Sequence, residues 1–348
     1  MTVVDLRSDV LTSPTEAMWT AMRSAEVGWA LVHEDDNVAR LETLGARLLG
    51  KEASVFTPTC SMANLVALMT LGPHGTQVVL ERQAHIAVGE AWGLAYVCGL
   101  FAHALDSADG ILSPDAVEHA LARAEMPGTS LLVLENTHTR AGGAAMTAVQ
   151  TNALADVAHR YGASVHLDGA RLLNAAAALG IDAHDLTLGV DTVSLSLNKG
   201  LGAPMGALLA GSTDVVVRAR LNLKRLGGAS IHQAGVLAAA AIVALDTAIP
   251  TLAADNRAAS ELAARLTALP GVCVRPVAVR TNIVTLDLSL SPLTAEQLVY
   301  VLCERGVRAY PQGVQHVRFV THRSIRAPEI ERVVAAVRAT LSRARSPA

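Results

Sequence analysis

The sequence is poor in cysteine and in aromatic residues, and it has no hydrophobic run long enough to cross a membrane. Its four cysteines are scattered without a CxxC pair. This argues against a disulfide framework or a cysteine-based zinc site and is typical of a reducing cytosol. The longest nearly unbroken apolar run, 234–245, is shorter than the ~20 residues of a membrane-spanning helix. Because the first ten residues also lack the apolar segment of a signal peptide, we expect a soluble cytoplasmic protein without a membrane partner.

An excess of charge of either sign is missing as well. The formal net charge is −3 and 17% of the residues are charged, so no basic surface is expected to bind nucleic acid. The 12 histidines show no HExxH or comparable spacing, so we expect no metal site. Lysine is scarce, because only Lys51, Lys199 and Lys224 stand among the 28 basic residues. A lysine kept at a special place in such a chain is a candidate for lysine-specific chemistry.

The 348 residues are enough for a large core and two domains. Short β-rich apolar runs alternate with amphipathic helical patterns over the first two thirds of the chain. The runs lie at 54–57, 77–80, 131–135, 164–167, 192–197 and 206–210, and helical patterns lie at 62–71, from 113 onward and at 151–161. This alternation predicts an α/β fold with a mainly parallel sheet and helices on both faces. Ligands then bind at the carboxyl ends of the strands.

The pattern changes near residue 246. Helical patterns at 255–269, 294–305 and 328–342 surround two strand candidates at 280–286 and 317–321. We therefore predict a large domain over 1–245, with an N-terminal arm over 1–25, and a smaller α+β C-terminal domain over 246–348.

Lys199 stands in SLSLNKGLGAPMG, 194–206, after a strand candidate and before a glycine-rich loop. A deprotonated lysine condenses with an aldehyde to a Schiff base, as in pyridoxal phosphate enzymes, whereas arginine cannot. The ordinary alternative is an exposed lysine at a strand end. Asp168, in SVHLDGAR, 164–171, ends another strand candidate. Although such an aspartate is commonly only a turn residue, a pyridoxal ring nitrogen needs an anionic partner, so the two residues together favour that cofactor.

A third stretch, TPTCSMAN at 57–64, links a strand candidate to an apolar helix. Small hydroxyl residues and free N–H groups at a helix N-terminus form a seat for phosphate. Taken alone this signal is weak, because serine and threonine cap many helices.

With these three stretches, the chain resembles the threonine aldolases of the β-eliminating lyase group, which belong to the fold type I class of pyridoxal phosphate enzymes. The resemblance runs nearly end to end. Its motifs are DLRSDVLTSPTEAM (5–18), LETLGARLLGKEASVF (41–56), QAHI (83–86), LENTHTRAGG (134–143), HLDGARLLNA (166–175), NKGLGAPMG (198–206), QAGVLAAA (233–240) and VRFVTHR (317–323).

The resemblance implies a role for each matching residue. Lys199 would hold the cofactor covalently, Asp168 would pair with its ring nitrogen, and Arg171 would contact the ring hydroxyl or the substrate. His85 would stack on the ring and act as the base for the β-hydroxyl. The remaining implied contacts are the phosphate seat Thr59, Cys60 and Ser61, the second lysine Lys224, and the substrate-binding residues Ser8, His33 and Arg318.

The implied reaction is the retro-aldol cleavage of L-threonine or related β-hydroxy-α-amino acids to glycine and an aldehyde, by a homodimer or homotetramer. One alternative keeps the cofactor but predicts β-elimination or racemisation. A second alternative is an aldolase-like chain that has lost its activity and kept a binding or assembly role.

The sequence departs from the family pattern at four places. Val32 and His33 stand where the family has tyrosine and glycine, and Glu125 or Met126 stands where it has a second histidine. GGASIHQAG, 227–235, carries His232 and lacks the family's arginine, and Cys60 replaces a glycine. Because of the first departure, we expect a more apolar surface at 29–32. Such a surface would admit larger aldehydes, such as the one released from phenylserine.

Overall fold

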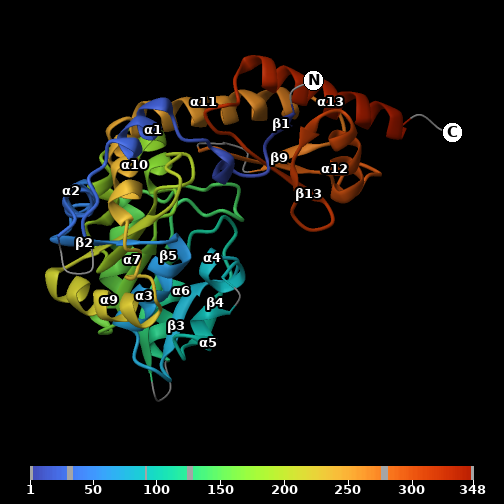
Figure 1. The fold of residues 1–348 in the computed structure, drawn as a ribbon. Coiled ribbons are helices and arrows are strands. Elements are labelled where there is room, and N and C mark those ends of the chain that lie inside the picture. The colour runs from blue at the N-terminus through green and yellow to red at the C-terminus, as the bar shows by residue number, and fades with distance from the viewer. Residues whose placement is uncertain (1–2, 30–33, 91, 124–127, 276–280, 346–348) are drawn as a thin grey trace.

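The structure is a computed structural model of the chain, and it describes residues 3–29, 34–90, 92–123, 128–275 and 281–345. Its larger part, coloured from blue to yellow in Figure 1, contains a seven-stranded sheet. The strand order is β2-β8-β7-β6-β5-β3-β4, and β8 alone runs antiparallel to its neighbours. The strands are β2 (Ala53–Thr57), β3 (Gln77–Glu81), β4 (Phe101–Leu105), β5 (Thr129–Glu135), β6 (Ser164–Asp168), β7 (Thr192–Ser196) and β8 (Ala207–Gly211). The prediction of a mainly parallel α/β sheet is confirmed.

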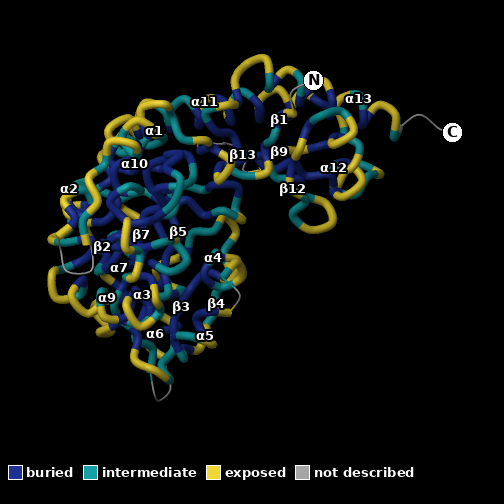
Figure 2. The backbone as a smooth tube through the Cα atoms, viewed as in Figure 1, coloured by how far each residue is buried: buried dark blue, intermediate teal, exposed yellow. Residues whose placement is uncertain are grey.

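Helices cover both faces of this sheet, and successive strand residues enter opposite cores. Val79 and Leu132 pack in one core, while Val78 and Leu131 pack in another. The central strands are accordingly buried in Figure 2, whereas the edge strand β4 is partly exposed, and the other exposed residues lie mainly on outer helices and loops. The helices of this part are α1 (Glu16–Arg23), α2 (Asp36–Leu48), α3 (Cys60–Leu71), α4 (His85–Val88), α5 (Gly93–Tyr96), α6 (Pro114–Ala122), α7 (Ala148–Arg160), α8 (Leu172–Leu179), α9 (Thr213–Arg225) and α10 (Ala234–Asp246), with 3-10 turns η1 (Asp9–Leu11) and η3 (Ala183–Thr187).

Side-chain caps set the helix starts. Ser113 accepts a hydrogen bond from the Ala116 N–H, and Pro114 occupies the first turn of α6, as the sequence predicts. Helix α7 begins three residues earlier than predicted, because Thr147 and Gln150 form a reciprocal capping box. The edge strand β4 was not predicted, since Phe101, its first residue, is exposed and the strand lacks a buried apolar pattern.

The C-terminal part, orange to red in Figure 1, contains an antiparallel sheet. Its strand order is β12-β13-β10-β9. Its elements are α11 (Ala248–Thr267), β9 (Cys273–Arg275), β10 (Ile283–Asp287), α12 (Ala295–Glu304), β11 (Val307–Arg308), β12 (Tyr310–Pro311), β13 (His316–Val320) and α13 (Ala327–Arg345). Helix α11 begins seven residues before the predicted start. Pro250 does not prevent this, because a proline in the first turn removes no intrahelical hydrogen bond.

The N-terminal arm packs on the C-terminal part. Strand β1 (Val4–Asp5) pairs in parallel with β11. Val4 and Leu6 are buried in the core formed by α11, α12 and α13. The domain boundary near residue 246 stays a prediction. At this place α10 meets α11 at a 66° bend, and the described chain has no single helix that could cross a membrane, although this bent pair together reaches the required length and composition.

Leu6 anchors the arm. Its side chain is fully buried, its N–H donates to the Arg308 carbonyl at 2.8 Å, and its own carbonyl accepts from the Val320 N–H at 2.8 Å. We expect Leu6→Ala to lower the free energy of unfolding by about 2–5 kcal/mol, because it leaves a cavity in this core. Urea denaturation measures the change, and Val3→Ala, which shortens an exposed neighbour, is the matched control. Equal stability of the two variants would show that the arm is not anchored here.

Candidate active site

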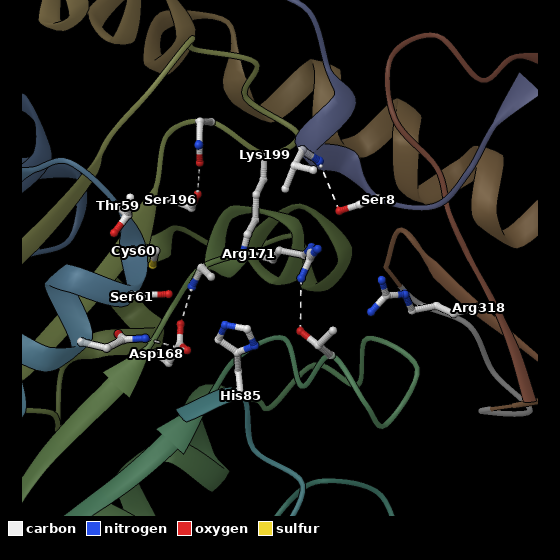
Figure 3. A pocket seen from close by; sticks show the side chains of 15 residues that line it. Ser8, Thr59, Cys60, Ser61, His85, Asp168, Arg171, Ser196, Lys199 and Arg318 are labelled. Atoms are coloured by element: carbon white, nitrogen blue, oxygen red, sulfur yellow. Dashed lines mark hydrogen bonds between the residues drawn. The ribbon is translucent and has the colours of Figure 1, made fainter. Parts of the chain in front are cut away.

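The site forms where strands of the large sheet end. Strands β2, β3, β6 and β7 all run in one direction, so the residues that follow their carboxyl ends gather at one edge of the sheet. A pocket of about 330 Å³ lies there (Figure 3). Its lining includes these predicted residues: Ser8, Thr59, Cys60, Ser61, His85, Asp168, Arg171, Lys199 and Arg318.

Lys199 follows β7 by three residues. Its side chain extends into the pocket and is half-buried (Figure 3). Within the described chain its ammonium has neither a hydrogen bond nor an ion pair. Keeping a charged ammonium in a partly buried pocket without a partner costs free energy. The amine of Lys199 is therefore available to a bound molecule.

Asp168 ends β6 and is buried at the base of the pocket. Its Oδ2 accepts a hydrogen bond from Asn64 Nδ2 at 3.0 Å, and its Oδ1 accepts one from the Ala170 N–H at 3.1 Å. These two donors fix the orientation of the carboxylate, which faces the pocket in Figure 3.

Asn64, on α3, is itself fixed by side chains of the sheet. Its Oδ1 accepts from the Ser194 hydroxyl at 2.7 Å and lies 3.0 Å from His166 Nε2. Because that oxygen only accepts, His166 Nε2 must carry the proton, and Nδ1 accepts from the Thr192 hydroxyl at 2.8 Å. Burial lowers the pKa of His166 to about 4, in agreement with this neutral tautomer.

Glu90 is a second carboxyl group beside Asp168, and the sequence analysis did not identify it. Its side chain is 2% exposed, and its Oε1 accepts from Asn64 Nδ2 at 2.9 Å. Its Oε2 is buried and has no hydrogen-bond partner in the part of the chain that the structure describes. Burial and then the negative charge of Asp168 raise the pKa of Glu90 to about 8. Asn64 therefore donates to two carboxyl groups, of which Glu90 is the protonated one near neutral pH.

The N-terminus of α3 forms another wall of the pocket. Thr59 caps this 12-residue helix, because its hydroxyl accepts from the Met62 N–H at 3.1 Å. Cys60 and Ser61 start the helix and line the pocket. Burial raises the pKa of the Cys60 thiol to about 12, so this residue is a neutral lining group. The free N–H groups of the first turn suit a phosphate.

Arg171 forms a buried bidentate ion pair with Asp9. Its Nε and Nη2 donate to the two carboxylate oxygens at 2.7 Å each, and Nη1 donates to the Thr139 hydroxyl at 3.1 Å. Burial alone would raise the pKa of the Asp9 carboxyl, but the charges of Arg171 and Lys199 hold it well below its usual range. The ion pair positions the guanidinium at the pocket wall.

Arg318 reaches the pocket mouth from β13. Its Nη2 donates to the Arg7 carbonyl at 3.1 Å, and its guanidinium lies 4.8 Å from the centre of the Tyr310 ring. Its buried Nε has no hydrogen-bond partner among the described residues. Ser8 lies above Arg318 on the same side of the view in Figure 3, and its hydroxyl caps η1 by accepting from the Val10 N–H at 3.3 Å. An arginine with an unused donor suits a carboxylate.

His85 begins α4 and is held through its backbone. Its N–H donates to Glu135 Oε2 at 2.7 Å, and Glu135 Oε1 accepts from the Thr139 N–H at 2.9 Å. The ring lies over Gly89, where an added Cβ would come within 2.4 Å of Nδ1. Its Nε2 lies 3.8 Å from Glu90 Oε1. The imidazole is 38% exposed and points into the pocket (Figure 3).

Other predicted residues are not brought into this pocket. Lys224 lies in the last turn of α9, and His232 is exposed before α10; neither lines the pocket. His33, with Val32, lies outside the described residues, as do Glu125 and Met126. Of the surface expected at 29–32, only Trp29 is described; it is exposed and does not line the pocket. The roles of these residues stay predictions.

The residues of the site that were not predicted from the sequence include Asp9, Asn64, Glu90 and Thr139. Asp9 could have been found as the neighbour of Ser8. Asn64 could have been found as the only amide on the apolar helix that follows the phosphate-like loop.

The protonated state of Glu90 gives a pH-dependent prediction. Between about pH 5 and pH 8 the folded chain holds a proton on Glu90 that the unfolded chain has released, so stability falls as pH rises. The Glu90→Gln variant has no titratable group at this position. We therefore expect the free energy of unfolding of the wild type, relative to that of the variant, to fall by up to about 1.4 kcal/mol per pH unit over this range. Urea denaturation of cofactor-free protein at several pH values measures it. Parallel pH profiles for the two proteins would contradict the assignment.

Comparisons with known proteins agree with this geometry. Residues 5–289 match the family model described as β-eliminating lyase. The low-specificity L-threonine aldolase 1 of Arabidopsis thaliana is 38% identical over 337 residues, which cover 95% of this chain and 94% of the relative. The low specificity L-threonine aldolase of Escherichia coli K12 is 33% identical, with 98% and 100% covered. The alanine racemase TOXG of Cochliobolus carbonum is 30% identical, with 95% and 85% covered.

The fold is shared with solved structures. The threonine aldolase of Leishmania major superposes with a TM-score of 0.83 at 19% identity and covers 97% of this chain and 99% of that one. The chain belongs to the β-eliminating lyase family, among its threonine aldolases, and has the fold of type I pyridoxal phosphate enzymes.

Proposed function

We propose that this chain is a pyridoxal phosphate-dependent carbon–carbon lyase that cleaves L-threonine and related β-hydroxy-α-amino acids to glycine and an aldehyde. The main support for the proposal is one pocket lined by Lys199, Asp168, His85 and Arg318. The amine of Lys199 has no partner there among the described residues. The named activity of the threonine aldolase relatives supports it.

The residues of the pocket fit pyridoxal phosphate. Lys199 offers an amine without a partner, Asp168 offers a buried carboxylate with a fixed orientation, and the start of α3 offers N–H donors for a phosphate. When bound, the cofactor supplies an electron sink for the pair released by the broken Cα–Cβ bond.

The chain's own side chains would orient the substrate and move its protons. Arg318, with its unused Nε, would bind the α-carboxylate together with Ser8. His85 would take the proton of the β-hydroxyl as the Cα–Cβ bond breaks. Arg171 is held by Asp9 and Thr139, so it would keep a fixed charge beside the reacting atoms.

Two alternatives remain distinct from this proposal. β-Elimination or racemisation would use the same cofactor site, and the racemase relative keeps the second of these open. A non-catalytic chain would bind ligands without turnover. Analysis of the products from L-threonine separates them, because only retro-aldol cleavage gives equal amounts of glycine and acetaldehyde.

We also propose a homodimer or homotetramer in the cytoplasm. Exposed apolar residues support assembly: Val10 and Leu11 lie in the arm beside the pocket, and Trp92, Tyr96 and Phe101 lie near the edge strand β4. The free state of all four cysteines supports a reducing compartment. Light scattering on the purified protein determines the size of the assembly.

Lys199 provides the first functional prediction. The wild type supplied with pyridoxal phosphate should show a visible absorption band and release glycine and acetaldehyde from L-threonine. Lys199→Arg keeps the positive charge but cannot condense with an aldehyde, and Lys199→Ala removes the charge as well. We expect both to lose the band and at least about 10³-fold in kcat/KM. An unchanged band in either variant would exclude Lys199 as the cofactor lysine.

His85 provides the second functional prediction. His85→Phe keeps a flat ring against the cofactor but cannot accept a proton. We expect kcat for L-threonine to fall about 10²- to 10⁴-fold, while the dissociation constant of the cofactor changes little. Absorbance titration and steady-state kinetics measure the two effects. A variant that weakens cofactor binding and leaves kcat intact would reverse the assignment.

A further inference from the structure

A second hollow adjoins the active-site pocket. Its volume is about 470 Å³, and it shares His85, Thr139 and Arg318 with the first pocket. Its remaining lining is Gly89, Arg140, Tyr310, Pro311, Gln312 and Gly313. The two spaces are therefore continuous past the imidazole that the proposed function makes the base for the β-hydroxyl.

The side chains that line this hollow include two positive charges. Its lining contains Arg140 and Arg318 and, among the described residues, no carboxylate. Burial lowers the pKa of Arg318, and the nearby charges of Arg171 and Arg140 lower it further. Arg140 forms no ion pair within the described chain. A concave site with two arginines and no acid attracts an anion.

A hydrogen bond between two loops helps to form the hollow. Gln312 Nε2 donates to the Arg140 carbonyl at 3.2 Å, and this contact joins the loop after β5 to the loop after β12. Among the described residues, Gln312 Oε1 and Arg318 Nε are buried side-chain atoms without a hydrogen-bond partner. Arg318 Nε can donate to a carboxylate, whereas Gln312 Oε1 can only accept from a donor group.

We propose that this hollow is the subsite for the substrate's side chain beyond Cβ, and that it selects β-hydroxy-α-amino acids whose side chain ends in a carboxylate. The inference rests on the proposed function. Because Arg318 binds the α-carboxylate at the mouth of the first pocket, Arg140 is the cation left for the distal carboxylate. The distal group passes His85 and enters the hollow.

The reaction with such a substrate is balanced as for threonine. The β-hydroxyl proton goes to His85, the Cα–Cβ bond breaks, and Cβ becomes the carbonyl carbon of an aldehyde. Cα takes up a proton, so 3-hydroxyaspartate gives glycine and glyoxylate, and 3-hydroxyglutamate gives glycine and 3-oxopropanoate. No oxidant or further co-reactant is required.

The test compares substrates that differ only in charge. The holoenzyme is assayed with 3-hydroxyaspartate against 3-hydroxyasparagine, and with 3-hydroxyglutamate against 3-hydroxyglutamine, using both Cβ epimers. We expect kcat/KM for the acid to exceed that for the amide by about three- to tenfold in at least one pair. An acid-to-amide ratio of one or less in both pairs overturns the proposal.

Variants then assign the selectivity to Arg140. We expect Arg140→Gln to bring the acid-to-amide ratio close to one, and Arg140→Lys to keep part of it because the charge remains. Arg47→Gln, at an exposed arginine on α2 away from both pockets, is the matched control and should keep the wild-type ratio. A ratio that does not change in Arg140→Gln overturns the proposal. An equal loss for acid and amide also overturns it, because Arg140 would then serve the α-carboxylate or the fold.

A binding measurement separates this inference from the proposed function. L-Aspartate and L-asparagine lack the β-hydroxyl, so they cannot be cleaved, and calorimetry on the holoenzyme gives their dissociation constants. Tighter binding of aspartate that is lost in Arg140→Gln supports the subsite even if threonine is not cleaved. Equal binding of the two overturns the subsite, and cleavage of threonine in the same preparation leaves the proposed function standing.

Discussion

The buried ion pair between Asp9 and Arg171 connects the parts of the chain that build the site. Asp9 belongs to the N-terminal arm, Arg171 follows β6, and Asn282, just before β10, donates to Asp9 at 3.1 Å. A buried ion pair offsets its desolvation cost only when further hydrogen bonds complete it. Asn282 and Thr139 supply these bonds. The arm, the large sheet and the C-terminal sheet are thereby held around one pocket, and residues from all three line it.

A second constraint is the single amide of Asn64. Its oxygen is occupied by Ser194 and His166, so its two N–H groups are left for the carboxyl groups of Asp168 and Glu90. Two carboxylates cannot both be charged cheaply at such proximity in a buried site. The arrangement gives the charge to Asp168, which ends its strand, and keeps the proton on Glu90.

The sequence was enough to predict the sheet and much of the site, because both follow from where apolar runs end. Thr59, His85, Asp168 and Lys199 each follow such a run, and strands of one direction gather their ends at one edge. What could not be predicted depends on contacts between distant segments. The amide of Asn64 and the position of Arg140 opposite Gln312 leave no periodic signal. The pairing of β1 with β11 joins residues some three hundred positions apart, and it too leaves no periodic signal in the sequence.

That pairing has a consequence for how the protein is made. Val4 is synthesised about three hundred residues before its partner Val307, so this contact closes a long loop. Asp9 can pair with Arg171 as soon as that residue has been made, whereas the strand of the arm gains its partner only with β11, and long-range contacts of this kind form slowly. A chain released early would have its sheet and its lysine, yet it would lack the strand that holds the arm over them. The arm that carries Ser8 and Asp9 is therefore held in full only after β11 has been made.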